Sequence, residues 1–264
     1  MKPNPFLSHL TLALLLLATA TSTRAQDILL GFRDSLESQV LQETRHVYIG
    51  LPANYETSGK AYPVVYRLDG DADVFAETMG VVHRLVYMEE VVPEVIVVAI
   101  ENTDRGRDMM PPHNGAPESG TKNFKTFIER ELIPRVEGSY RTTGQRVLCA
   151  QSASTIFSMY CFLSSPGMFD AYVASSAGFP GCEPYFSGLT DAFLANPVQH
   201  STRIFISQGG QDELDPDAVM QGQVARFIAR ITTVEGVDCR YRLYPDEGHV
   251  PFQSLYHGLK FVFE

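Results

Sequence analysis

The residues best suited to covalent chemistry begin with a serine that follows a run typical of a buried strand. Residues 146–151 read RVLCAQ, and Ser152 stands where this pattern gives way to a helical one. A serine on a tight strand-to-helix turn exposes its hydroxyl in front of the helix N-terminus, which is the geometry of a nucleophile elbow. The N–H of Ala153 would then point at an oxyanion that forms on the attacked carbonyl. The alternative is that Ser152 only caps the helix.

The usual G-x-S-x-G pattern of such a turn is not intact in this chain. Ala150 and Ser154 occupy the two glycine positions. Glycines let the strand and the helix approach closely, and alanine and serine are their smallest replacements. We therefore expect the elbow to survive with slight repacking, at a cost of about 1–3 kcal/mol.

A histidine and an acid later in the chain could complete a catalytic triad. His249 lies between the last predicted strand and the last predicted helix, at the sheet edge where Ser152 also lies, so it could act as general base. Asp212 follows the end of another strand and would orient the imidazole. As alternatives, His249 is a surface residue and the acids cap a helix, with Glu213 and Asp215 as fallbacks for the orienting acid.

A second oxyanion donor could come from the segment 64–72, which reads VVYRLDGDA. A predicted strand ends there in Asp-Gly, and we place the donor at the backbone N–H of Asp71. A plain β-turn is the alternative, because no side chain marks such a donor.

The elements that must position these residues alternate between strand and helix patterns. Strand patterns are predicted at 47–51, 64–68, 95–100, 146–150, 171–175, 203–207 and 239–244, and helix patterns at 124–136, 217–233 and 251–262. Nearly continuous apolar runs indicate strands buried on both faces of a parallel sheet. The alternation predicts a doubly wound α/β domain with right-handed crossovers. Residues 105–122 are predicted as a long loop, and residues 180–194 as a partly helical excursion.

Composition narrows the class of protein. The chain has 264 residues, 44% of them apolar, with 21 Lys and Arg against 31 Asp and Glu, which gives a net charge of −10. This composition excludes a disordered chain or a coiled coil, and the acidic balance argues against nucleic-acid and anionic-membrane partners. We find no Walker A loop, Rossmann glycine fingerprint or HExxH motif, so we expect no metal or organic cofactor.

The first 25 residues have the pattern of a secretory signal peptide. Lys2 gives a positive start, residues 10–20 read LTLALLLLATA, and residues 23–25 (TRA) precede a cleavage site. A buried helix is the alternative. We expect an exported protein, periplasmic or secreted, whose residues 26–264 form one domain and insert in no membrane after cleavage.

Export would permit disulfides among the four cysteines. Three pairings are open, and none of the spacings is CxxC, which disfavours a zinc site. We expect Cys149 and Cys161 to be small buried hydrophobes and Cys182 with Cys239 to be the pair if one forms.

Several longer stretches then show a family resemblance. They are YPVVYRLDG at 62–70, ENTDRGRD at 101–108, FIERELIP at 127–134, PGMFDAYV at 166–173, DEGH at 246–249 and SLYHGLKFV at 254–262. The chain resembles the putative esterase (esterase D-like) family of α/β-hydrolases, particularly the branch with the periplasmic siderophore esterases. The resemblance covers most of residues 38–264 and implies an α/β-hydrolase fold with a mostly parallel central sheet and helices on both faces. It implies a serine esterase with Ser152 as nucleophile and His249 as base.

The expected function is therefore hydrolysis of small-molecule carboxylic esters through an acyl-enzyme on Ser152. Arg105 and Arg107 lie in a stretch that is near the site in the family, and one of them could bind an anionic group; alternatively Arg107 pairs with an acid and braces its loop. Relatives usually read Gly-His-Ser-x-Gly-Gly where this chain reads AQSAST at 150–155. Because of this departure, a non-catalytic or weakly active binding protein on the same fold is one rival function. An acyltransferase, which keeps the chemistry but changes the acceptor, is the other.

Overall fold

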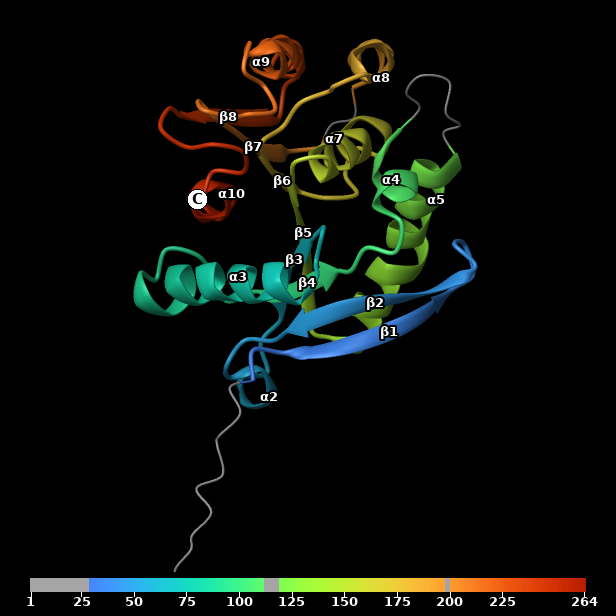
Figure 1. Cartoon of the computed structure of the whole chain (residues 1–264). Helices are drawn as coiled ribbons and strands as arrows, with labels where there is room; N and C mark the ends of the chain where they lie inside the picture. The colour runs from blue at the N-terminus through green and yellow to red at the C-terminus, as the bar shows by residue number, and fades with distance from the viewer. Residues whose placement is uncertain (1–28, 112–118, 198–199) are drawn as a thin grey trace, which may run out of the picture.

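The computed structural model describes residues 29–111, 119–197 and 200–264, so the predicted signal peptide lies outside the described residues. Figure 1 shows a central twisted sheet with helices on both sides. The eight strands of the described chain are β1 (Phe32–Ser38), β2 (Glu43–Gly50), β3 (Tyr62–Arg67), β4 (Ile96–Ile100), β5 (Thr142–Gln151), β6 (Ala171–Ser175), β7 (Thr202–Gly209) and β8 (Val237–Tyr244).

The sheet order places the carboxyl ends of the central strands at one edge. The order is β1-β2-β4-β3-β5-β6-β7-β8. Strands β3 to β8 run parallel to their neighbours, whereas β1 and β2 form an antiparallel hairpin that joins the sheet through β4. The predicted parallel α/β sheet is therefore confirmed. β1 escaped prediction because its sequence, FRDSLES, is a largely exposed edge strand without an apolar run.

The helices that the structure describes follow the strands. They are α2 (Tyr55–Ser58), α3 (Ala72–His83), α4 (Arg105–Met109), α5 (Ser119–Phe127), α6 (Ile133–Ser139), α7 (Ser154–Ser164), α8 (Glu183–Ala195), α9 (Val219–Ile231) and α10 (Ser254–Phe263), with π-helical segments at Arg84–Met88 and Ile128–Leu132. The helix predicted at 124–136 spans α5, the second π segment and α6. The π segment ends at Leu132, and Pro134, which cannot donate a backbone hydrogen bond, lies two residues later.

Two hydrophobic layers pack against the sheet, one on each face. Alternate strand residues face opposite sides, so Val65 packs with α3 and α10 whereas Val64 and Tyr66 pack with the helices of the other face. In Figure 1, α3 and α10 lie on one side of the sheet and α7 and α8 on the other. No helix in the described part of the chain is long and apolar enough to cross a bilayer.

Two expectations are wrong. The stretch 105–122 is not one long loop, because α4 occupies Arg105–Met109 and α5 begins at Ser119. The Cys182–Cys239 disulfide is not formed, since all four cysteines are free. Burial raises the pKa of the Cys239 thiol to about 12, so this sulfur stays protonated and unreactive.

Candidate active site

Ser152 lies on the turn that joins β5 to α7. Its backbone has φ 54°, the left-handed region that residues other than glycine rarely adopt. The N–H of Ser152 donates to the carbonyl of Ser175 in β6 at 2.9 Å, which fixes the turn against the neighbouring strand. Strained backbone of this kind persists where the surrounding structure determines it, commonly at functional sites. The serine thus has the backbone geometry of a nucleophile elbow.

Ser154 closes the elbow that lacks its usual glycines. Its side chain is fully buried. The hydroxyl donates to the carbonyl of Gln151 at 2.7 Å and accepts from the N–H of Gln151 at 2.9 Å. Ala150 is buried as well. The serine that replaces glycine therefore forms hydrogen bonds that stabilise the turn, and it does not strain the turn by its size.

The structure brings Ser152, His249 and Asp212 into one hydrogen-bonded line. The Nε2 of His249 lies 2.7 Å from the Oγ of Ser152, and its Nδ1 lies 2.8 Å from the Oδ2 of Asp212. A carboxylate can only accept, so Nδ1 carries the proton and Nε2 is free to accept the serine proton. The carboxyl of Asp212 is buried and also accepts from the N–H of Leu214 at 2.9 Å, which holds it in place.

The other acids of this segment have different roles. Asp215 accepts from the N–H groups of Met220 and Gln221 at 2.9 and 3.0 Å, so it caps the start of α9. Glu213 is exposed. Asp212 is therefore the acid that contacts His249, and the helix-capping alternative applies to Asp215.

A serine that sequence reasoning missed holds the histidine loop. Val250, the residue after His249, has φ 58°, and its N–H donates to the Oγ of Ser176 at 2.7 Å. Ser176 is buried and itself has φ 54°. It follows the end of β6, at the same sheet edge as the elbow, and that position was the signal available in the sequence. Two residues with a left-handed backbone conformation are thus joined by a hydrogen bond next to His249.

The proposed oxyanion donors lie at helix starts. Ala153 is the N-cap residue of α7, directly after Ser152. Asp71 is the N-cap residue of α3, and its N–H donates to the carbonyl of Asp69 at 3.0 Å. The Asp71 N–H is thus engaged within its own turn in this structure.

Arg105 reaches the elbow. Its Nε and Nη2 donate to the two oxygens of Asp69 at 2.7 and 2.8 Å, and Nη2 lies 3.4 Å from the carbonyl of Gln151. Asn102 also donates to Asp69 at 2.8 Å. Burial favours the neutral form of Asp69, but the bonds from Arg105 and Asn102 outweigh it and lower the pKa of this carboxyl. Arg105 keeps 41% of its side chain exposed next to the turn that carries Ser152.

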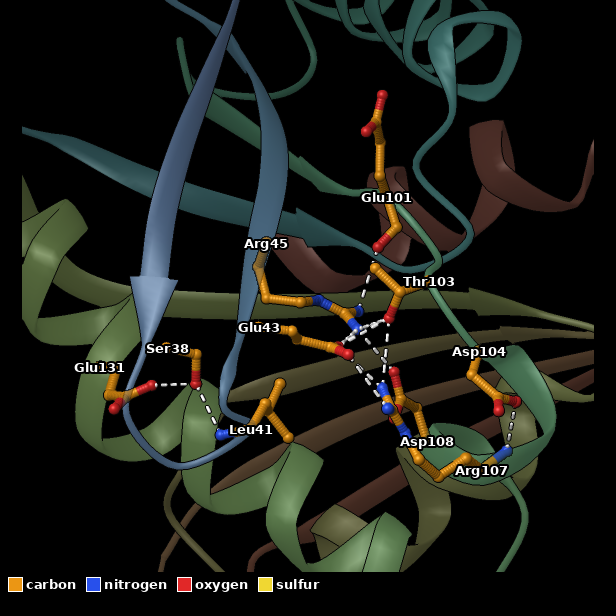
Figure 2. A network of polar contacts seen from close by, with 10 residues as sticks. All are labelled: Ser38, Leu41, Glu43, Arg45, Glu101, Thr103, Asp104, Arg107, Asp108 and Glu131. Atoms are coloured by element: carbon orange, nitrogen blue, oxygen red, sulfur yellow. Dashed lines mark hydrogen bonds and ion pairs between the residues drawn. The ribbon is translucent and has the colours of Figure 1, made fainter.

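Arg107 points away from the elbow. Figure 2 shows its guanidinium among the side chains of Glu43, Arg45 and Asp108, between β2 and α4. It contacts Glu43 at 2.8 Å and Asp108 at 2.6 Å, while the fully buried Arg45 contacts Asp108 at 2.7 Å. The hydrogen bond from Arg107 lowers the pKa of Glu43 to about 2. The expectation that Arg107 contacts substrate is therefore replaced by its alternative: it braces α4 against the hairpin.

The described residues contain no cluster of side chains that would form a metal site. No group of three or more histidine, cysteine or acidic side chains in those ranges is arranged to hold a metal ion.

Comparison with known proteins agrees with the geometry. Residues 38–254 match the family described as "Putative esterase". The ferri-bacillibactin esterase BesA of Bacillus subtilis is 23% identical over 239 residues, covering 81% of this chain and 82% of that protein. The apo-salmochelin esterase of Escherichia coli is 27% identical over 235 residues, covering 79% and 71%.

A solved structure extends the similarity to three dimensions. The IroE-like serine hydrolase of Shewanella oneidensis superimposes with a TM-score of 0.76 at 28% identity, covering 88% of this chain and 80% of that one. From the family match, the sheet and this likeness together, we conclude that the chain belongs to the "Putative esterase" family, has the α/β-hydrolase fold and is a carboxylic ester hydrolase.

Proposed function

We propose that the protein hydrolyses esters through an acyl-enzyme on Ser152. The observation that carries the proposal is the unbroken line from Asp212 through His249 to Ser152, with hydrogen bonds of 2.8 and 2.7 Å. Both distances are short enough for proton transfer. The left-handed backbone of Ser152 presents the hydroxyl at the carboxyl edge of the sheet, where a substrate can approach.

The chemistry follows from the order of these contacts. The Oγ of Ser152 attacks the ester carbonyl as the Nε2 of His249 takes its proton, and the carboxylate of Asp212 stabilises the resulting imidazolium. The tetrahedral intermediate collapses when the C–O bond to the alcohol breaks and His249 returns the proton to that oxygen. Water then repeats the sequence on the acyl-enzyme and releases the acid.

The negative oxygen of the intermediate needs donors close to the elbow. The N–H of Ala153 follows the nucleophile directly and is the first donor. The N–H of Asp71 is the second, and it would exchange its 3.0 Å bond to Asp69 for one to the oxyanion. A well-placed donor contributes about 3–4 kcal/mol to the transition state.

The substrate class we propose is a small siderophore-type ester. Support comes from the relatives, which are named as esterases of ferri-bacillibactin and of apo-salmochelin. Arg105 supplies a matching group, because its half-exposed guanidinium lies beside the elbow and is held by Asp69 through Nε and Nη2. Its Nη1 can donate to an anionic or hydroxylated group of the substrate. The chemistry requires no cofactor.

We further propose that the protein is exported and that residues 26–264 act as one domain. The positive start, the apolar run and the small residues before position 26 support this proposal. Mass spectrometry of the N-terminus of protein recovered from periplasm or medium tests it, with a mature chain beginning at Gln26 as the expected result.

Hydrolysis of p-nitrophenyl acetate and butyrate tests the mechanism. We expect turnover by the purified protein and a loss of about 10³-fold or more in Ser152→Ala and in His249→Ala. A wild-type rate no higher than that of the variants would favour a binding protein. Product analysis with added alcohols distinguishes hydrolysis from acyl transfer.

A further inference from the structure

A buried arginine stands directly behind the nucleophile turn. Arg67 is the last residue of β3, the strand next to β5, and only 3% of it is exposed. Its Nη2 donates to the side-chain Oε1 of Gln151. Because Gln151 immediately precedes Ser152, this contact joins a cation to the strand residue from which the nucleophile turn departs.

This guanidinium carries a charge that no close carboxylate neutralises. Within the described ranges, no acid lies within ion-pair distance of Arg67, and its Nε has no hydrogen-bond partner. Burial lowers the pKa of Arg67, but an arginine remains protonated in a folded protein. Burying a charge without a carboxylate partner is costly.

We propose that Arg67 is a positioning residue of the active site: it holds Gln151 at the elbow and places a fixed positive charge behind Ser152. This inference rests on the proposed reaction at Ser152. A positive potential there favours the negative oxygen of the intermediate, and the imidazole of His249 serves as a reporter of that potential.

The surroundings leave this charge largely unbalanced. The groups that face it or the elbow from neighbouring elements are Cys149 in β5, Glu77 in α3, the Asp69–Arg105 pair and the Asp212–His249 pair. Burial raises the pKa of Cys149 to about 12, so the thiol is neutral. Asp69 is already paired with Arg105, and Glu77 is exposed, so water screens it.

Three variants separate the hydrogen bond from the charge. Gln151→Glu keeps an acceptor for Arg67 and cancels its charge. Gln151→Met removes the acceptor and keeps the charge. Arg67→Met removes both. Arg226→Gln is the matched control, because it deletes one positive charge on α9 from a side chain that is 63% exposed.

Two measurements read the effect. The titration of the His249 imidazole by NMR, assigned with His249→Gln, gives its pKa without relying on turnover. The pH profile of kcat/KM for p-nitrophenyl butyrate gives the pKa of the same imidazole in the active enzyme. Thermal unfolding of each variant shows that it is folded.

We expect Gln151→Glu and Arg67→Met to raise the His249 midpoint and the acidic limb of the pH profile by about one pH unit, because each variant cancels or removes a positive charge that opposes protonation of the imidazole. Their kcat should fall roughly tenfold. Gln151→Met and Arg226→Gln should leave the midpoint in place.

A midpoint that stays fixed in folded Gln151→Glu overturns the inference, and so does an equal shift in Gln151→Met. If the proposed function itself is wrong, a different result is expected. Ser152→Ala would then hydrolyse the ester as fast as wild type, whatever the imidazole titration shows. Different observations would therefore contradict the role of Arg67 and the proposed reaction at Ser152.

Discussion

Replacing Ser154 by glycine would restore the residue type that such elbows usually have, yet the structure predicts that it destabilises the protein. The buried hydroxyl of Ser154 bonds both the N–H and the carbonyl of Gln151, at 2.9 and 2.7 Å. Glycine removes both contacts and leaves the Gln151 N–H without this acceptor in a site sheltered from water.

The magnitude follows from these contacts. An unsatisfied buried donor costs about 1–3 kcal/mol. The added backbone freedom of glycine costs a further 0.5–1 kcal/mol, roughly. The sum is about 2–4 kcal/mol, which for a chain of this size lowers the melting temperature by roughly 5–15 °C.

Thermal unfolding followed by circular dichroism is the assay. Ser154→Ala separates the two contributions, since it removes the hydroxyl without adding backbone freedom, and it should show most of the loss. Ser158→Ala is the matched control in the same helix: its buried hydroxyl donates only to the carbonyl of Thr155, at 2.9 Å, so about 1 kcal/mol is expected. A glycine variant as stable as wild type, or more stable, would refute the assigned role of Ser154.

Three further predictions follow from other contacts in the structure. Asp212→Asn should lower kcat by about 10³–10⁴-fold with a small change in KM, because the imidazole loses the acceptor that fixes its tautomer; stopped assays at several substrate concentrations measure both constants. Asp108→Ala should cost about 3–5 kcal/mol in urea unfolding, since the fully buried Arg45 loses a carboxylate at 2.7 Å, and a cost below 1 kcal/mol would contradict this. The pKa of Glu43 falls on folding from 4.5 to about 2, so its stabilising effect is complete above pH 4.5 and is lost as pH falls toward 2. The melting temperatures of wild type and Glu43→Gln, measured against pH, should therefore converge across that window.

The sequence by itself was enough to predict that Ser152 and His249 lie close together. Ser152 follows a continuous apolar run and precedes a helical pattern, and His249 lies on the loop after the last strand. Because parallel strands end at one sheet edge, these two residues had to share that edge once the βα alternation was recognised. Local periodicity carries this information, and the observed β5 and β8 include the ranges predicted for them.

The choice among chemically equivalent neighbours was decided only by the tertiary structure. Asp212 and Asp215 are both acids of one segment, and packing alone turned the first to His249 and the second to a helix N-terminus. Arg105 and Arg107 likewise lie two residues apart in α4, so their side chains leave the helix in different directions, one to the elbow and the other to Glu43. Such pairings join residues from distant parts of the chain, and no local pattern encodes which partner a side chain meets. The sequence thus determined which side chains with reactive groups are present, and three-dimensional packing determined which of them contact one another.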